Sequence, residues 1–368
     1  MLQLRHNGQN YTHFTSARVV ANIGMAVRSF TFTSTATAND LYPIRVNDYI
    51  EVVADDTAVI LKGYIDKLDM VYSADEHTIT LSGRSLLADL VDSTVKNEKL
   101  EFKESTLETI CRTVIKQLGL DIVVENQAGT IAPFKDIASA EIGENAFEFL
   151  EKYSRKRQVL LTTDGTNKLL LMRAGGRRAP VTLSNSTKNA VTNNVLTSNL
   201  SLDLSQRYYR YKSYAQLNPS LLDIKATPEK ISDQNGEFID KTIRSTRNFE
   251  FNAEDSAESS VVKNRAKWEC DIRTANSLKY QATVQGHTVN GVPWDINTVA
   301  TVVDDYADLK RELLIRRVEF IYSLTEGSVT NLSLTHKDAF KMSPIKTIKE
   351  SSSDGMPKWI AELLGQNR

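Results

Sequence analysis

Residues able to carry catalytic or metal chemistry are few in this sequence and are spread along it. The five histidines lie in segments that resemble strands or turns, without H-E-x-x-H spacing or an acidic partner at helical spacing: His6, His13, His77, His287 and His336. We expect them to be solvated or to lie on strand faces. No G-x-S-x-G or other nucleophile motif is present. The sequence therefore predicts no catalytic residue, no metal site and no cofactor.

Two pairs of neighbouring carboxylates are the strongest candidates for acid–base or calcium chemistry. Asp55-Asp56 and Asp304-Asp305 each follow a strand-like run and begin a turn. Neighbouring strand residues point to opposite faces, so neither pair converges on one site without a special loop. We therefore expect these carboxylates to have a structural role. Cys111 and Cys270 lack C-x-x-C spacing, and we expect both to be buried as small hydrophobic side chains.

Clusters of basic residues suggest contact with DNA or with an acidic partner. They are Arg155-Lys156-Arg157 and Arg173 with Arg177-Arg178. A strand through Tyr209 and Tyr211, which lie among arginines, would place both rings on one face in ordinary β packing. Lys+Arg 45 against Asp+Glu 46 gives a formal charge of -1, without the basic field typical of nucleic-acid binders. We expect no dedicated nucleic-acid site.

These residues belong to a chain of 368 residues, a length that suits two to four domains. A hydrophobic content of 41% and a charged content of 25% are ordinary for a folded protein and exclude a wholly disordered chain. No apolar run approaches the ~20 residues of a membrane helix, and a polar alternating stretch follows Met1 instead of a signal sequence. We expect no membrane insertion and synthesis in a cytosol-like compartment.

Strand patterns dominate residues 1–94, which we predict to form a first β-barrel. Asn7-Gly8 separates two strand-like runs, and this dipeptide tolerates the positive φ angles of a tight hairpin. Phe30 and Phe32 alternate with polar residues, which places both rings on one face of a strand.

The hydrophobic period then changes, which predicts an α+β module over residues 95–176. The run 105–108 (Ser-Thr-Leu-Glu) is typical of a capping box, and a helix with a buried apolar stripe follows until Gly119. A second helix is expected over 144–156. Two strands should then pair across Asp164-Gly165.

Strands are expected again in the last part of the chain. We predict a second β-barrel from residues 177–217 and 276–341, after a glycine-containing linker whose spacing does not fit a phosphate-binding loop. Residues 218–275 are expected to be an excursion with a helix, capped by Asn252, that packs near the α+β module.

The tail, residues 342–368, contains a short amphipathic segment after a flexible spacer. Its apolar side chains fit one helical face and form the candidate partner-docking site: Trp359, Ile360, Leu363 and Leu364. A helix this short is not stable alone in water, so we expect it to dock. Its own subunit and a partner protein are both open as docking surfaces.

Two distant segments of the chain resemble each other, turns included. Residues 50–56 resemble 299–305, and Val71-Tyr72-Ser73 matches Ile321-Tyr322-Ser323 at an offset of 322 − 72 = 250 residues. Because short strands draw on few residue types, chance similarity is the alternative. If the duplication is real, a closed ring of three chains presents six similar units and can join a three-fold partner to a six-fold one.

The order of several motifs resembles the baseplate hub family of contractile-tailed phages, which includes Mu-like hubs and late-control tail proteins. The resemblance covers roughly residues 1–340 and rests on the segments 63–66, 80–92, 143–150, 157–161, 280–286, 292–297, 312–315 and 332–340. It implies a mainly β fold with an α+β insert, two tail-tube-like barrels and a homotrimeric, pseudo-hexameric ring. Such a ring adapts the six-fold tail tube to the three-fold central spike.

The resemblance also implies partners and a location. The partners would be a central spike protein, a tail tube or tube-initiator protein, baseplate wedge proteins and tape measure protein in the channel, with DNA only in transit. The protein would be part of the virion tail baseplate and would be assembled in the host cytoplasm. None of the matching motifs is catalytic, so we expect a structural protein and not an enzyme.

Two alternatives remain open from the sequence. An envelope-degrading or glycan-binding tail-tip protein needs a carboxylate pair in a cleft or a groove of exposed aromatic residues, for which the 13 tyrosines offer material. The equivalent hub of a contractile injection system needs the same geometry as a phage hub, so the sequence does not separate these two.

Overall fold

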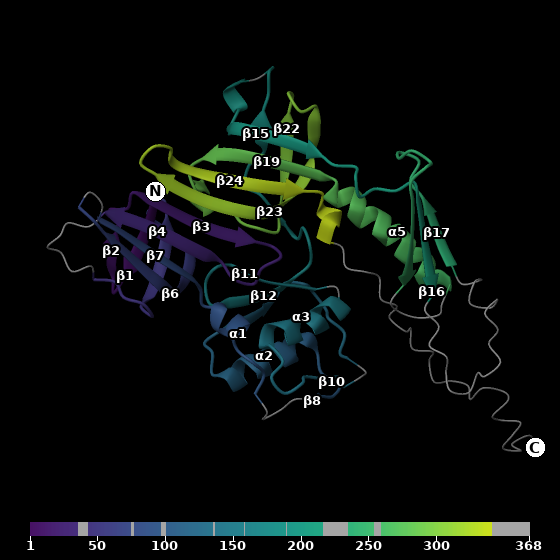
Figure 1. Ribbon diagram of the computed structural model, residues 1–368, viewed down its shortest axis with the longest axis horizontal. Coiled ribbons are helices and arrows are strands. Elements are labelled where there is room, and N and C mark those ends of the chain that lie inside the picture. Colours follow the sequence, from purple (N-terminus) through teal and green to yellow (C-terminus); the bar gives the residue numbers. More distant parts are fainter. Residues whose placement is uncertain are drawn as a thin grey trace, which may run out of the picture.

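A computed structural model gives the fold (Figure 1) and describes residues 1–35, 43–74, 77–96, 101–134, 137–157, 159–188, 190–215, 235–253 and 259–340. Strands, mostly antiparallel, dominate this part of the chain and helices are few, which confirms a mainly β fold. Within these ranges, no helix is both long enough and apolar enough to cross a membrane.

The N-terminal strands form the first part of a large sheet. They are β1 (Leu2–His6), β2 (Gln9–Tyr11), β3 (Ser16–Asn22), β4 (Ser29–Thr35), β5 (Tyr49–Ala54), β6 (Ala58–Tyr72) and β7 (His77–Ser85). Asn7 and Gly8 have φ angles of 49° and 77°, so the predicted tight hairpin joins β1 to β2. On β4, Phe30 and Phe32 are both buried on one face, as their alternation predicted.

A second group of strands continues the same sheet. It consists of β13 (Arg177–Arg178), β14 (Leu183–Asn185), β15 (Val195–Leu202), β19 (Leu278–Gln285), β22 (Thr298–Asp304), β23 (Leu309–Ser323) and β24 (Gly327–Thr335). The hairpin β20 (Thr288–Val289) and β21 (Val292–Pro293) and two 3-10 helices (Ala190–Thr192 and Lys337–Phe340) accompany it. β23 pairs antiparallel with β3, which joins the two groups into a sheet of 14 strands (Figure 1).

The two groups have the same strand order. β3, β4, β7, β6 and β5 are successive neighbours in the first group, and β15, β19, β24, β23 and β22 are successive neighbours in the second. Both long strands carry a register shift, between Ile65 and Lys67 on β6 and between Ile315 and Arg317 on β23. The two shifts lie 315 − 65 = 250 residues apart. On β23, the shift marks the point where the strand leaves β22 and begins to pair with β3.

Residues 87–172 form an α+β module with a hydrophobic core of its own. Its elements are α1 (Ala88–Asp92), β8 (Glu101–Phe102), α2 (Leu107–Leu118), β9 (Val123–Asn126), β10 (Ala138–Ser139), α3 (Ala146–Lys156), β11 (Leu160–Thr163) and β12 (Lys168–Met172). β11 and β12 pair antiparallel, as predicted. Cys111 is fully buried in this core, also as predicted, and burial raises the pKa of its thiol to about 12.

The start of α2 differs by one residue from the predicted capping box. Thr106 is the N-cap, because its Oγ1 accepts a hydrogen bond from the N–H of Thr109 at 3.2 Å. The hydroxyl of Ser105 instead donates to the carbonyl oxygen of Lys103 at 2.9 Å. Gly119 ends the helix with a φ of 73°, as predicted.

Thr106→Ala is expected to lower the free energy of unfolding by about 1 kcal/mol, because the N–H of Thr109 loses its acceptor. Ser105→Ala removes a neighbouring hydroxyl that does not cap the helix and should have a much smaller effect. Urea denaturation of both variants measures the difference. Equal losses would contradict a cap at Thr106.

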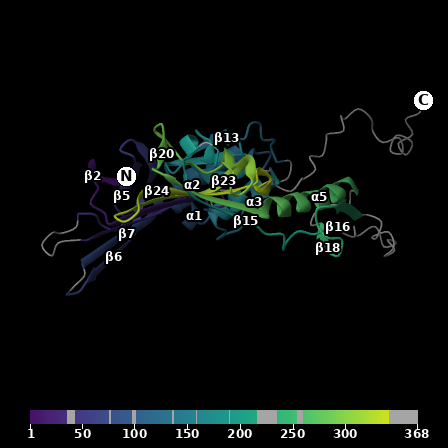
Figure 2. The same ribbon diagram turned by 90° about the horizontal axis from the view of Figure 1, so that it is seen from above.

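A smaller unit extends away from the second strand group (Figure 2). β16 (Arg210–Ala215), β17 (Asn235–Ile239) and β18 (Asn248–Ala253) form a three-stranded sheet, and α5 (Ser259–Asn276) packs on it. Its core contains Tyr211, Ala266 and Cys270, so Cys270 is buried as predicted. The described residues of α5 belong to this core and not to the core of the α+β module, in contrast to the packing expected for 218–275.

Two local predictions in this unit are wrong. Asn252 does not cap a helix but lies in β18, and α5 begins at Ser259. Tyr208, and not Tyr209, packs against Tyr211, with 6.0 Å between the ring centroids. Strand alternation does not extend back to these residues because β16 begins after them.

Arg28 joins three parts of the chain. Its buried guanidinium donates to the carbonyl oxygen of Ile60 at 3.0 Å, to that of Thr163 at 3.3 Å and to the carboxylate of Asp295 at 2.6 Å. Ile60 lies on β6, Thr163 ends β11 of the α+β module, and Asp295 precedes β22. Arg177 contacts the other oxygen of Asp295 at 3.1 Å. One guanidinium therefore fixes the module against both strand groups.

Candidate functional site

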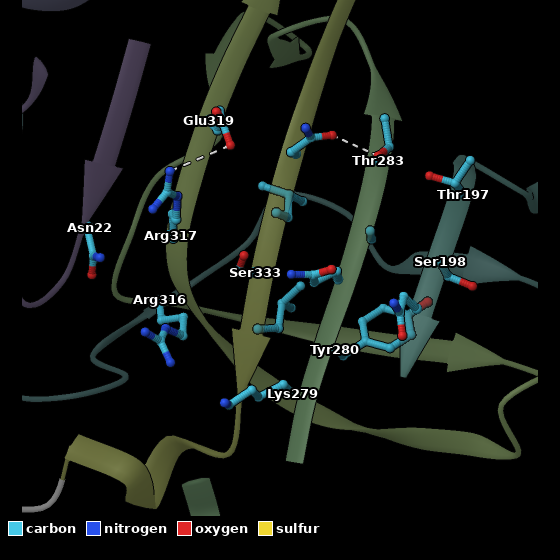
Figure 3. Close-up of a pocket in the computed structure, with 16 residues that line it drawn as sticks. Asn22, Thr197, Ser198, Lys279, Tyr280, Thr283, Arg316, Arg317, Glu319 and Ser333 are labelled. Atoms are coloured by element: carbon cyan, nitrogen blue, oxygen red, sulfur yellow. Dashed lines mark hydrogen bonds and ion pairs between the residues drawn. The ribbon is translucent and has the colours of Figure 1, made fainter. Parts of the chain in front are cut away.

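A polar groove lies on the face of the sheet where the two strand groups meet (Figure 3). It has a volume of about 700 Å³, and its walls come from β15, β19, β24, β23 and β3. Cross-strand neighbours form two rows along it: Asn199, Gln281, Ser333, Arg317 and Asn22, and then Thr197, Thr283, Asn331 and Glu319. The alternate residues of the same strands point into the core, so the face of the groove is polar.

The charges in the groove are of both signs and contact each other. Glu319 on β23 bonds to the guanidinium of Arg18 on β3 and lies 3.8 Å from that of Arg317. Beside them, the hydroxyl of Thr283 donates to the amide oxygen of Asn331 at 2.7 Å (Figure 3). The groove therefore presents amides, hydroxyls and partly compensated charge, which suits contact with water or with a passing polymer.

The groove does not assemble an acid–base pair. Glu319 is the single carboxylate among the lining residues, and these include no histidine and no cysteine. Across the described ranges, no group of three His, Cys, Asp or Glu side chains is arranged to hold a metal ion. Bond-making chemistry needs at least a nucleophile or a general base in reach of a substrate, and this face offers neither arrangement.

His287 is buried, contrary to the prediction for the five histidines. Its ring is fully enclosed, with Nδ1 3.2 Å from the hydroxyl of Thr330 and with Phe320 edge-on at 5.8 Å between ring centroids. Burial lowers the pKa of His287 to about 4. Asp55, from the first strand group, accepts the backbone N–H groups of His287 and Thr288 at 3.1 Å and 3.0 Å. This carboxylate therefore fastens a turn of the second strand group, a structural role as predicted.

The second carboxylate pair separates. Asp304 points inward and accepts the hydroxyl of Tyr280 at 2.7 Å, and burial together with this hydrogen bond raises the pKa of Tyr280. Asp305 faces outward and accepts the hydroxyl of Ser186 at 2.8 Å. The two side chains point to opposite sides of the strand, so they do not converge on one site, as predicted.

Members of the basic clusters form ion pairs within the chain. Arg155 lies 2.8 Å from Glu151, one turn earlier on α3, and Arg178 lies 2.5 Å from Glu312 on β23. These pairs reduce the positive charge that either cluster offers to a polyanion.

The candidate docking residues of the tail lie outside the residues that the structure describes: Trp359, Ile360, Leu363 and Leu364. Their role stays a prediction from the sequence.

Two strand edges, which the sequence analysis missed, have no strand partner within the described part of the chain. β6 pairs with β5 only as far as Tyr64, so from Lys67 to Tyr72 it pairs with β7 alone. β15 pairs with β19 alone. Apolar side chains along both edges are exposed, Met70 by 55%, Tyr72 by 78% and Leu202 by 63%. The signal that could have found these edges is the 250-residue offset, which relates β6 to a strand with neighbours on both sides.

Models of three domain families match the chain in sequence order. Residues 1–85 match the N-terminal domain of Mu phage baseplate assembly protein GpP-like, 87–173 the second domain of baseplate hub protein gp44-like, and 258–343 the fourth domain of Mu phage baseplate assembly protein GpP. Baseplate hub protein gp44 of Escherichia phage Mu is 27% identical over 303 residues, which are 81% of this chain and 77% of the Mu protein. The chain therefore belongs to the family of Mu-like phage baseplate hub proteins, as the motif order predicted.

Solved structures share the fold. The 43 kDa tail protein of prophage MuSo2 from Shewanella oneidensis has a TM-score of 0.77 at 25% identity, with 92% of this chain and 98% of that chain covered. The tail protein from Neisseria meningitidis MC58 gives 0.73 at 19% identity, with the same coverage. The E. coli c3393 protein, a component of the type VI secretion system, gives 0.55 at 10% identity over 93% and 79% of the chains.

Proposed function

We propose that this baseplate hub is a homotrimeric ring in which two similar β-barrels per subunit produce a pseudo-hexameric shape. The ring adapts the six-fold tail tube to the three-fold central spike. One observation carries the proposal: the two strand groups share their strand order, and their long strands carry register shifts 250 residues apart. Two similar units in each chain become six in a closed trimer.

The proposed division of the chain follows from the same repeat. Residues 1–94 form the first barrel and residues 177–217 with 276–341 the second, with the α+β module of 95–176 inserted between them. Each subunit then carries one insert and two barrels. The ring has six similar units on the side of the tube and three inserts that the spike can distinguish.

The polar groove is proposed to face the central channel. A channel that passes tape measure protein and then DNA must be wettable and must not retain a polyanion. The rows of amides and hydroxyls supply the first property, and the contacts of Arg18 and Arg317 with Glu319 favour the second. A reconstruction of the assembled baseplate in which unpaired arginines are stacked along the channel would contradict this assignment.

Sedimentation of the purified chain, alone and with its central spike protein, tests the ring. We expect a trimer in the presence of the spike, in which three identical surfaces are available. A chain that remains a monomer in both samples would contradict the proposal. The other proposed partners are the tube or tube-initiator protein and the baseplate wedge proteins, with assembly in the host cytoplasm.

We also propose that the hub has no envelope-degrading activity. The support is that glycoside hydrolysis uses two carboxylates on either side of the bond, and the groove supplies Glu319 alone. In a zymogram on cell-wall material, the purified chain should leave the gel intact while a lysozyme control clears it. Clearing by the purified chain would favour the tail-tip enzyme instead.

A further inference from the structure

We infer that neighbouring subunits are joined through two particular strand edges, β6 of one subunit and β15 of the next, in a register that the chain itself displays. The inference rests on the ring proposed above. Its template is the pairing of β23 with β3, which joins the two strand groups inside one chain. In a closed ring of similar units, the contact between subunits repeats the contact within a subunit.

The strands of the two groups correspond residue by residue. The shared register shift matches β6 to β23 at the offset of 250 residues. Following the pairings through β7 and β4, and through β24 and β19, then matches β3 to β15, with Asp203 in the place of Asn22 and 203 − 22 = 181. Local hydrogen bonds agree with this match. Asn22 Oδ1 accepts the N–H of Gly24 at 3.1 Å, and Asp203 Oδ1 accepts that of Ser205 at 2.8 Å.

The two long strands also carry the same charge pattern beside the edge. Arg317 and Glu319 on β23 lie 3.8 Å apart, and their counterparts Lys67 and Asp69 on β6 lie 2.5 Å apart. β3 covers this edge of β23, whereas no described strand covers the same edge of β6. The edge of β6 is therefore the counterpart of a pairing surface that is already in use elsewhere in the chain.

Replacing each template strand by its counterpart gives the register between subunits. The pairs are Lys67 with Asp203, Leu68 with Leu202, Asp69 with Ser201, Met70 with Leu200, Val71 with Asn199 and Tyr72 with Ser198, the second residue of each on the next subunit. This register places opposite charges together at one end, and it covers the exposed Met70 and Leu202 with apolar partners. A slip by one residue would lose both matches.

The pairing also explains why such long edges are left open. An exposed strand edge invites aggregation, and closure of a sheet on itself removes the edge. The eight strands from β15 to β6 form one continuous run in each chain, with the two edges at its ends. When β6 meets β15 of the next subunit three times, the run closes and no end remains.

Disulfide bonds between subunits can test the register, because the template shows which pairs are closest. The N–H of Leu324 donates to the carbonyl oxygen of Thr15 at 3.2 Å. Hydrogen-bonded and non-hydrogen-bonded pairs alternate from that point, so Ile321 with Arg18 is a non-hydrogen-bonded pair. Side chains approach most closely in such pairs, and this geometry suits a disulfide.

The counterpart of that pair is Val71 with Asn199, and both side chains are exposed in one subunit, so replacing them should not disturb the fold. We expect the full-length chain with Val71→Cys and Asn199→Cys to form covalent dimers and trimers on oxidation, seen on a non-reducing gel. The matched control, Val71→Cys with Leu200→Cys, places the thiols on opposite faces and should give no such product. The single variants should also give none. The native thiols, Cys111 and Cys270, are buried.

Sedimentation of the same samples separates this inference from the ring itself. Trimers without a Val71–Asn199 link, or with equal linking in the control pair, would overturn the register and leave the ring standing. Monomers without any link, with and without the spike, would overturn both. Lys67→Glu and Asp203→Lys give a second test: each alone should reduce the trimer fraction, and their combination should restore it. Failure of the combination to restore trimers would count against the register.

Discussion

Arg28→Ala should lower the free energy of unfolding by about 3–5 kcal/mol, the loss typical when one partner of a buried ion pair is removed. The variant leaves the carbonyl oxygens of Ile60 and Thr163 without this donor, and Asp295 keeps only Arg177 of its two cationic neighbours. Because these acceptors belong to both strand groups and to the α+β module, the loss weakens three contacts at once. Urea or guanidinium denaturation of the full chain measures it.

Arg178→Ala is the matched control. Its guanidinium also forms an ion pair, with Glu312 at 2.5 Å, but its side chain is 69% exposed. Exposed ion pairs contribute little, so this variant should unfold close to the wild type. Arg28→Lys keeps the charge and loses the fork of donors, so it should fall between the two. Equal losses for Arg28→Ala and Arg178→Ala would contradict the role assigned to the buried guanidinium.

The stability of the protein should fall by about 3 kcal/mol between pH 6.5 and pH 4 because of His287. Burial holds the pKa of this imidazole at about 4 in the folded chain, against 6.5 as its ordinary value. Between these two values the unfolded chain binds a proton that the folded chain does not bind, so acid favours unfolding. The contribution is complete above pH 6.5 and is lost progressively down to pH 4. Chemical denaturation at several pH values measures the slope.

His287→Gln removes the titrating group and keeps an amide that can hydrogen-bond to Thr330. Its stability should change less with pH over this window than that of the wild type, even if it is lower at neutral pH. His77→Gln changes a half-buried residue at the start of β7 and should keep the wild-type slope. A His287→Gln slope equal to that of the wild type would show that another group causes the acid sensitivity.

Features that depend on neighbours in sequence could be predicted correctly. The Asn7-Gly8 hairpin, the buried alternation of Phe30 and Phe32 and the helix end at Gly119 follow from local backbone preferences. The cap of α2 could not be fixed, because two adjacent hydroxyls were available and the backbone conformation selects Thr106. Local preferences therefore located the elements to within one or two residues.

Features that depend on distant partners could not be predicted. Asn252 has the side chain of a helix cap, but it pairs in β18 with a strand that lies far earlier in the sequence. His287 is buried because its turn is bonded to Asp55, 232 residues away. The polar groove likewise needs the pairing of β23 with β3, which brings Asn22 beside Arg317. The repeat hinted at this geometry, but only the pairings give its register.

The ladder between β23 and β3 also determines how the chain responds to force. Seven successive residue pairs connect the two strand groups, and their hydrogen bonds run perpendicular to the strands. A pull along the strands loads all of these bonds in shear at once, whereas a pull across them opens the bonds one after another. The molecule is therefore mechanically anisotropic, and its stiffest axis is parallel to β3 and β23.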